Sequence, residues 1–108
     1  MKAFEVKVVT RFHSLCQIPY YSCLCRTKET AETYFKMAKE RTVSKITNEW
    51  NVDKDKDDEF EADFGGYRDY FHLFIQEVET NYEFIEGEWR KGYLSEEEPQ
   101  QETKVIGE

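Results

Sequence analysis

A stretch of alternating residues interrupted by two glycines constrains the fold of this chain more than any other feature. In EFEADFGGYRDYFHLFIQEVE, residues 59–79, apolar and acidic side chains alternate before Gly65, and after Gly66 one set of apolar side chains, at 71, 73 and 75, alternates with a second, largely aromatic set at 70, 72 and 74. Alternation with a period of two is typical of β-strands, and a two-residue Gly-Gly connection favours a tight hairpin turn because both positions can require a positive φ. The sequence therefore predicts an antiparallel hairpin. Its outgoing strand is apolar on both faces, which indicates a central strand covered at least in part on both sides.

Two further strands are expected near the N-terminus. In residues 3–12, apolar side chains occupy every second position, which predicts a strand with one buried face. In YYSCLCR, Tyr21, Cys23 and Cys25 share one side of a second strand. Pro19 precedes these residues and marks a turn or an edge. Because the connection is short, the two strands are predicted to form an antiparallel hairpin.

Residues 27–50 carry the pattern of a long amphipathic helix. Thr27 is expected to be the N-cap, and Glu29 favours the first turn through the helix dipole. Lysines and glutamates lie opposite an apolar stripe, so we expect the helix to pack against the sheet. The stripe recurs at steps of three and four and consists of Ala31, Tyr34, Phe35, Ala38, Thr42, Ile46 and Trp50.

These elements predict a single α+β domain over residues 1–94. Their order is β-β-α-β-β, with an antiparallel sheet of four to five strands and one long helix on one face. YEFIEGEW, residues 82–89, is compatible with the extra strand. Residues 95–108 lack a periodic pattern and are expected to form a flexible acidic tail.

The distribution of charge limits the partners that such a chain can bind. The net charge is −8, but residues 1–50 carry +4 and residues 51–108 carry −12. The acidic half repels nucleic acid and anionic membranes and attracts basic surfaces. No apolar run is long enough to span a bilayer, and the N-terminus lacks the pattern of a secretory signal. We therefore expect a cytoplasmic protein with reduced cysteines.

The stretch NVDKDKDDEFEADF holds seven acidic side chains among fourteen residues. Asp53, Asp55 and Asp57 alternate as do the first ligands of a calcium loop. That motif requires Gly at its sixth position and Glu at its twelfth, where this chain has Asp58 and Phe64. The stretch is better interpreted as a solvated loop that leads into a strand, or as a surface that meets a partner.

Four soft metal ligands lie close together in the first quarter of the chain. His13, Cys16, Cys23 and Cys25 have the spacing H-x2-C-x6-C-x-C, and zinc would accept such a set if the hairpin brought the side chains together. The spacing is not that of a standard zinc knuckle, and reduced cysteines more often fill a core. No metal site is therefore expected, and zinc is the less favoured alternative.

Motifs for catalysis or for phosphate binding are missing from the sequence. There is no G-x-S-x-G, no Walker loop and no G-x-G-x-x-G, and no flanking motif supports a Cys–His pair with His13 or His72. The aromatic strand after Gly66 does not fit the pattern of an RNA-recognition sheet, and its surroundings are acidic. We expect a protein without enzymatic activity or cofactor that does not bind nucleic acid directly.

The favoured interpretation is a small acidic cytosolic binding protein. It would inhibit or regulate a basic protein partner, for example one that handles nucleic acid, as small inhibitors carried by phages or other mobile elements do; this comparison rests on size and charge alone. Clustered carboxylates steer such an encounter, and aromatic side chains anchor it. The predicted partner-binding residues are Asp53, Asp55, Asp57, Asp58, Glu59, Glu61, Asp63, Tyr67, Tyr70 and Trp89.

Two alternatives remain open at this stage. The first is a small-molecule or nucleotide-binding domain that holds its ligand between helix and sheet, or at a dimer interface. The aromatic residues expected at that site are Tyr21, Tyr34, Tyr70 and Trp50. The second is a domain stapled by a metal on the four soft ligands. The sequence also permits a homo-oligomer.

Overall fold

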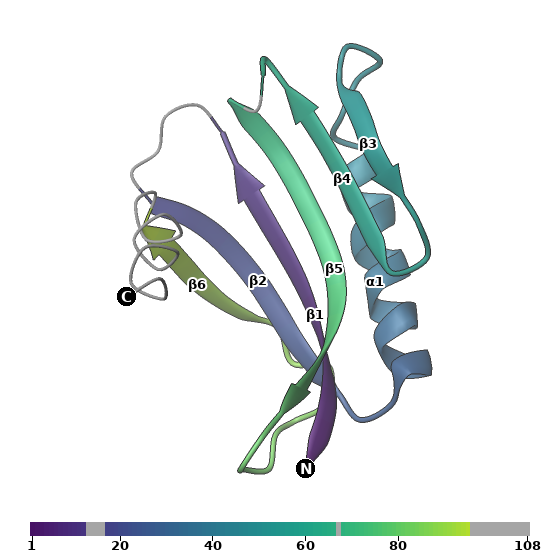
Figure 1. The fold of residues 1–108 in the computed structure, drawn as a ribbon, viewed down its shortest axis with the longest axis vertical. Helices are drawn as coiled ribbons and strands as arrows, with labels where there is room; N and C mark the ends of the chain where they lie inside the picture. The colour runs from purple at the N-terminus through teal and green to yellow at the C-terminus, as the bar shows by residue number, and fades with distance from the viewer. Residues whose placement is uncertain (13–16, 67, 96–108) are drawn as a thin grey trace, which may run out of the picture.

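The computed structural model describes residues 1–12, 17–66 and 68–95 of the 108-residue chain. These residues form an α+β fold in which one helix packs on one face of a six-stranded antiparallel sheet, and the strand order is β3-β4-β5-β1-β2-β6 (Figure 1). The elements are β1 (Lys2–Arg11), β2 (Gln17–Cys25), α1 (Lys28–Val43), β3 (Asn51–Asp55), β4 (Glu59–Phe64), β5 (Asp69–Glu79) and β6 (Arg90–Ser95).

The sheet has six strands rather than the four to five expected from the sequence. The acidic stretch, interpreted as a loop, contains β3 at one edge of the sheet, where β4 supplies its backbone partners. At the opposite edge, β6 consists of residues 90–95, whereas the extra strand was expected at 82–89. Both edge strands lack the alternation that marks a half-buried strand, because their side chains contribute little to the core.

The hairpin around the two glycines is formed by β4 and β5, as predicted. Gly65 has φ 69° and Gly66 has φ 67°, so both adopt the left-handed conformation that glycine favours. The connection is longer than the expected two residues, because Phe64 and Asp69 are the last strand residues to pair across it. The amide of Arg68 donates to the carbonyl of Gly65 at 3.3 Å and closes the turn.

The helix begins as predicted and ends earlier. The side chain of Thr27 accepts a hydrogen bond from the amide of Thr30 at 3.2 Å, which confirms the N-cap. Helix α1 ends at Val43, where β-branched residues lower helix propensity. Ile46 and Trp50 lie beyond this end and still pack against the core. In the described residues, no helix has the length and apolar character needed to cross a membrane.

The core lies between α1 and the sheet. Cys23 and Cys25 point to this side of β2, as the alternation predicted. Pro19 lies inside β2 rather than before it, where it pairs with Tyr93 of the edge strand β6 and where the pairing of β2 with β1 ends at Val9 and Tyr20. The largest fully buried side chains are Phe35, Phe60, Leu73, Val6, Cys23 and Cys25.

Strand β5 is central in the sheet, as predicted, and the face opposite α1 is covered only in part. Tyr70, His72 and Phe74 lie on this face and are half-buried. No described helix or strand packs over them, since α1 contacts the other face. The apolar character of both faces of β5 therefore reflects its central position in the sheet and not a second covering layer.

Candidate functional site

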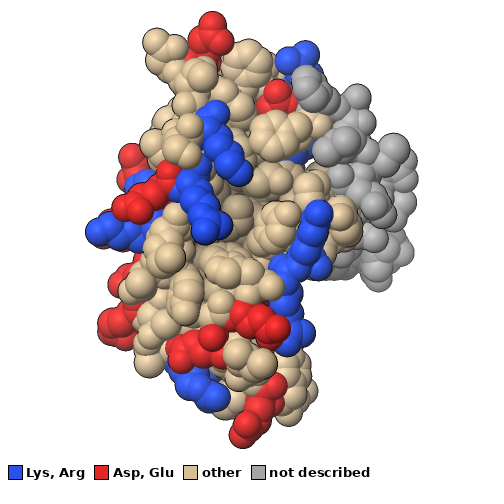
Figure 2. Space-filling model, turned by 180° about the vertical axis from the view of Figure 1, so that it is seen from behind, with Lys and Arg blue, Asp and Glu red and all other residues tan. Residues whose placement is uncertain are grey.

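A cavity of about 500 Å³ lies between α1 and the sheet. Figure 2 shows this face of the molecule, with a hollow among mostly uncharged side chains near its centre. The walls come from α1 and the residues after it, from β1, β2 and β5, and from the segment before β6. The lining residues are Val8, Thr10, Tyr21, Tyr34, Met37, Ala38, Arg41, Thr42, Lys45, Phe71 and Trp89.

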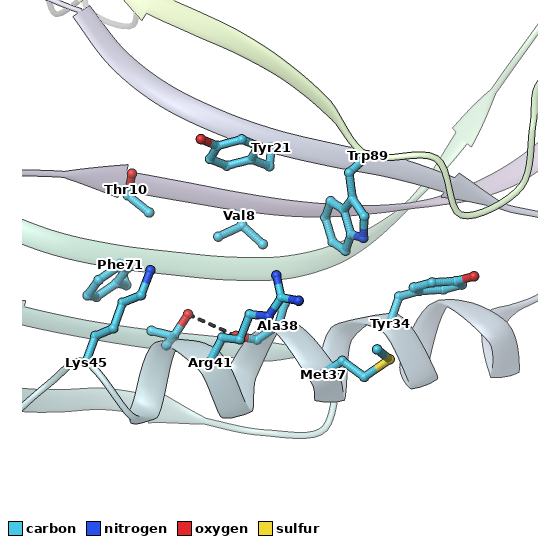
Figure 3. A pocket seen from close by; sticks show the side chains of 11 residues that line it. Val8, Thr10, Tyr21, Tyr34, Met37, Ala38, Arg41, Lys45, Phe71 and Trp89 are labelled. Atoms are coloured by element: carbon cyan, nitrogen blue, oxygen red, sulfur yellow. Dashed lines mark hydrogen bonds between the residues drawn. The ribbon is translucent and has the colours of Figure 1, made fainter.

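The helical wall follows from the spacing of its residues. Tyr34, Ala38, Arg41 and Lys45 succeed one another at steps of three and four, so they lie along one flank of the helix and its extension. Phe35 lies beside this flank and enters the core, where its exposed fraction is 2%. Figure 3 shows the side chains of Arg41 and Lys45 rising from this wall toward the sheet.

The floor is formed by side chains on one face of three neighbouring strands. Val8 and Thr10 are two positions apart on β1 and therefore point the same way. Val8 pairs with Tyr21 of β2, and Thr10 pairs with Phe71 of β5. The short side chains of β1 thus lie between two larger rings, which leaves space above the middle of the sheet.

The cavity has a third wall besides the helical wall and the floor. It is formed by Trp89, in the segment between β5 and β6. Its indole ring extends toward α1 (Figure 3) and meets the ring of Tyr34 edge-on, with centroids 6.4 Å apart and planes at 78°. The segment is fastened to β2 because the amide of Gly87 donates to the carbonyl of Leu24 at 3.0 Å. The position of Trp89 is therefore set by contacts with α1 and β2.

Among the described residues, the lining of the cavity contributes hydroxyl groups and cations but no carboxylate. Its lining includes Arg41 and Lys45, and neither forms an ion pair with a carboxylate of the described residues. The hydroxyl of Thr42 donates to the carbonyl of Ala38 at 3.0 Å, so this polar group is satisfied inside the helix. The arrangement offers an apolar and aromatic surface beside two positive charges.

The structure brings together only some of the aromatic residues expected at a small-molecule site. Tyr21 and Tyr34 line the cavity. Trp50 instead packs against Phe71, with centroids 5.5 Å apart, and supports the floor from the side. Tyr70 lies on the opposite face of the sheet. Trp89, expected on a partner surface, lines the cavity.

Sequence reasoning missed the two cations of the cavity. The sequence has Arg41 and Lys45 among the other lysines and glutamates of residues 27–50, a pattern typical of an ordinary helix surface. The signal that could have found them is their spacing from Tyr34 and Ala38, which places all four residues on one flank. Val8, Thr10, Met37, Thr42 and Phe71 were likewise not predicted as site residues.

Two carboxylates of the acidic stretch are neutralised by neighbouring cations. Asp55 forms an ion pair with Lys39 of α1. Glu59 approaches Lys54 at 3.4 Å and the ring nitrogen Nε2 of His72 at 2.9 Å. The hydrogen bond with His72 lowers the pKa of Glu59 most, and Lys54 lowers it further. The stretch is therefore less negative toward a partner than its sequence suggests.

Other carboxylates of this stretch repel one another on the face of the sheet opposite α1. Asp53 lies in the irregular part of the β3–β4 pairing. A hydrogen bond with Asp63 raises the pKa of Asp53 most, and the negative charges of Asp63 and Glu61 raise it further. Asp63 is itself buried, with an exposed fraction of 4%. It is thus less accessible to a partner than Asp53.

The remaining residues of the predicted partner surface do not form one patch. Asp57 and Asp58 lie in the turn between β3 and β4, close to the other carboxylates. Tyr70 is half-buried on β5, and Trp89 precedes the opposite edge strand β6. Tyr67 lies outside the described residues. The structure therefore gathers the acidic residues and separates Trp89 from them.

The thiols of Cys23 and Cys25 belong to the core. Both side chains are buried, and burial is the largest cause that raises the pKa of Cys23 to about 12 and also raises that of Cys25. His13 and Cys16, the other members of the zinc set, lie outside the described residues. Among the residues that are described, no three His, Cys, Asp or Glu side chains are grouped to hold a metal ion.

No family model matches this chain, and neither a curated protein nor a solved structure matches it. The function must therefore be argued from the geometry of the site.

Proposed function

We propose that this protein is a non-enzymatic binding domain that holds a small organic molecule in the cavity between α1 and the sheet. The observation that carries the proposal is the cavity itself, whose volume of about 500 Å³ lies in the range of ligand pockets. Such pockets are lined mainly by apolar and aromatic side chains with a few convergent polar groups. The lining described above has this character.

The exposure of large aromatic rings at the cavity supports the proposal. Tyr21 and Trp89 are each 39% exposed, although burial of such rings is strongly favourable. A planar ligand that lies against them would remove apolar surface from water, at about 25 cal/mol for each Å² buried. This gain is available without rearrangement of the core, because Phe35 and Phe60 are already packed elsewhere.

The chemistry of the lining favours binding over catalysis. Its possible nucleophiles are hydroxyls and the amine of Lys45, and no histidine or carboxylate of the described residues lines the cavity beside them as a base. His72 faces away from the cavity and pairs with Glu59. The thiols of Cys23 and Cys25 are buried, and burial raises the pKa of both, so they form even less thiolate at neutral pH than an exposed cysteine.

A dye titration tests the proposal. N-phenyl-1-naphthylamine is neutral and fluoresces in apolar sites, so the wild type should bind it saturably with one site per chain. Ala38→Phe places a ring in the cavity from α1 and should reduce the affinity at least tenfold. Thr33→Phe adds the same ring on the exposed side of α1 and serves as the control. Equal binding by wild type and Ala38→Phe would show that the dye lies elsewhere.

The exposed edge of the sheet favours a second candidate function, the binding of a basic protein segment at β3. In the described sheet β3 pairs only with β4, and all five of its residues are exposed. An edge strand with free backbone groups can accept an added strand from a partner. Asp53 and the neighbouring turn would attract a segment rich in lysine or arginine.

An alternating lysine–valine peptide tests this second candidate. It should shift the backbone amide resonances of residues 51–55 in NMR spectra, more strongly at low salt. Asp53→Lys combined with Asp57→Lys should weaken binding through a slower association rate. Glu40→Lys combined with Glu83→Lys changes the net charge equally at sites away from this edge. If both double variants weaken binding to the same extent, the peptide responds to net charge and not to β3.

A further inference from the structure

The charge at the cavity is positive, whereas the net charge of the chain is negative. The chain carries a net charge of −8, yet the lining contains Arg41 and Lys45 and, within the part of the chain that the structure describes, no carboxylate. Cations in the last turn of a helix are favoured by the helix dipole. The dipole does not explain why both side chains turn from the helix toward the sheet, as Figure 3 shows, rather than away into solvent.

A third cation stands on the opposite side of the hollow. The ammonium group of Lys91, on β6, lies 5.8 Å from the centre of the ring of Tyr21, which lines the cavity. The same group lies 5.1 Å from the ring of Tyr93. In Figure 2, Lys and Arg side chains accordingly flank the uncharged hollow on both sides. The positive charge converges on the cavity from α1 and from β6.

This convergence has an energetic consequence for a ligand. Arg41 lies in the last turn of α1 and Lys45 two residues beyond its end, and two like charges that line the same cavity repel each other. No described carboxylate pairs with either group. An anion between them would remove the repulsion and accept charge-assisted hydrogen bonds from a guanidinium and an ammonium.

Trp89 and Tyr34 lie at the end of the cavity away from Lys45, and Arg41 lies between Lys45 and Trp89 (Figure 3). The two rings meet edge-on with centroids 6.4 Å apart, and Val8 lines the same cavity from the sheet. A planar ring that lies along the floor could contact the indole of Trp89 while a substituent reaches Arg41. The cavity thus places a ring site and an anion site within the reach of one small molecule.

We propose that the ligand of this cavity is a small aromatic molecule that bears one anionic group, such as a carboxylate or a sulfonate. Its ring packs between Trp89 and the strands of the floor, and its anion binds Arg41 and Lys45. This inference rests on the proposed function of the cavity and adds the chemical class of the ligand. A polyanion such as nucleic acid is disfavoured, because the remainder of the chain is acidic.

Two dyes that share the same rings separate the anion site from the ring site. The first, 8-anilinonaphthalene-1-sulfonate, is N-phenyl-1-naphthylamine with one added sulfonate. The wild type should bind the sulfonated dye about tenfold more tightly than the neutral one. Arg41→Gln combined with Lys45→Gln should remove this preference, so that the two dyes bind the variant with similar affinity. Lys28→Gln combined with Lys36→Gln removes two exposed cations of the same helix and should preserve the preference.

The outcomes distinguish failure of this inference from failure of the proposed function. If the wild type binds both dyes equally, or if the Arg41 and Lys45 double variant keeps the preference, the cavity has no anion site. If neither dye binds, or if Ala38→Phe leaves the binding of the neutral dye unchanged, the cavity is not a ligand site and both proposals fail. Near-UV circular dichroism of each variant establishes that it is folded before it is titrated.

Discussion

The ring of Tyr34 lies directly against the backbone of Gly87. A Cβ built on Gly87 would lie 2.6 Å from the ring carbon that carries the hydroxyl group, and the glycine has φ 80°. Only glycine satisfies both conditions, since another residue would meet the ring and would strain the backbone. This contact joins α1 to the segment before β6, two residues ahead of Trp89. The third wall of the cavity therefore depends on a glycine that does not line it.

Gly87→Ala is expected to destabilise the fold and to disturb the cavity. A left-handed φ costs a non-glycine residue about 1 kcal/mol, and the overlap with Tyr34 adds about 1–3 kcal/mol. Gly66→Ala is the matched control, because Gly66 has φ 67° and a Cβ added there would meet no atom within 4 Å. Urea unfolding should show a larger loss for Gly87→Ala, together with weaker binding of the neutral dye. Equal losses of stability in the two variants would mean that the ring of Tyr34 can move away from residue 87 without an energetic cost.

Phe35→Ala is expected to be among the most destabilising substitutions on α1. Phe35 is 2% exposed, so its removal leaves a cavity and should cost about 3–5 kcal/mol. The next residue, Lys36, is exposed, so Lys36→Ala should change the free energy of unfolding by no more than about 0.5 kcal/mol. Thermal and urea unfolding of the two variants give the comparison. A small effect of Phe35→Ala would mean that α1 presents a different face to the sheet.

Lys39→Ala should cost more than Lys36→Ala, although the sequence alone places both lysines on the polar side of the helix. Lys39 forms an ion pair with Asp55, and its ammonium group lies 5.5 Å from the centre of the ring of Phe60. A half-exposed pair and a cation–π contact together contribute about 0.5–1 kcal/mol. Unfolding of Lys39→Ala, Asp55→Ala and the double variant measures the coupling. Additive losses would show that the ion pair does not contribute.

Cys23 and Cys25 should resist alkylation in the folded protein. Both thiols are buried, and burial raises the pKa of Cys23 to about 12, so little thiolate forms at pH 8. In a Cys16→Ser background, iodoacetamide should modify neither residue before unfolding and both residues in urea. Mass spectrometry over time counts the modified thiols. Rapid modification in the folded state would contradict the core position of these residues.

The alternation and capping rules predicted the parts of this fold that depend on local sequence. Thr27 caps α1 because its hydroxyl accepts a hydrogen bond within the same turn, and the positive φ of Gly65 and Gly66 follows from their own lack of a side chain. Strand β3 was missed because its pairing with β4 places Val52 at an exposed edge, so no apolar pattern marks it. The extended conformation of β3 is set by its backbone pairing with β4, which the sequence of β3 alone does not reveal.

The cavity could be predicted only in part for a similar reason. Tyr21 and Tyr34 were expected near a ligand, because a strand and a helix that pack together bring their apolar faces into contact. Trp89 could not be placed there, since its position depends on the contacts that the nearby Gly87 makes with Leu24 and Tyr34, which are distant in sequence. Long-range contacts of this kind leave no periodic signal. The charge of the site was hidden because Arg41 belongs to a helix that is charged along most of its length.

Asp53 and Glu59 should give stability profiles of opposite sign with pH. Asp53 has a raised pKa, so the folded state binds its proton more tightly than the unfolded state does. Its contribution to stability is present below the ordinary value of 3.8 and is lost as the pH rises through the folded pKa. Asp53→Asn should therefore gain stability relative to the wild type between about pH 3 and pH 6, and its amide can donate a hydrogen bond to Asp63.

Glu59 behaves in the opposite way because its pKa is lowered, first by the hydrogen bond with His72. Its contribution is present above the ordinary value of 4.5 and is lost as the pH falls through the folded pKa. Glu59→Gln should thus lose stability relative to the wild type as the pH rises over the same range. Urea unfolding followed by tryptophan fluorescence at intervals of pH measures both slopes. Two slopes of the same sign would mean that Asp53 and Asp63 do not share a hydrogen bond, or that His72 does not bind Glu59.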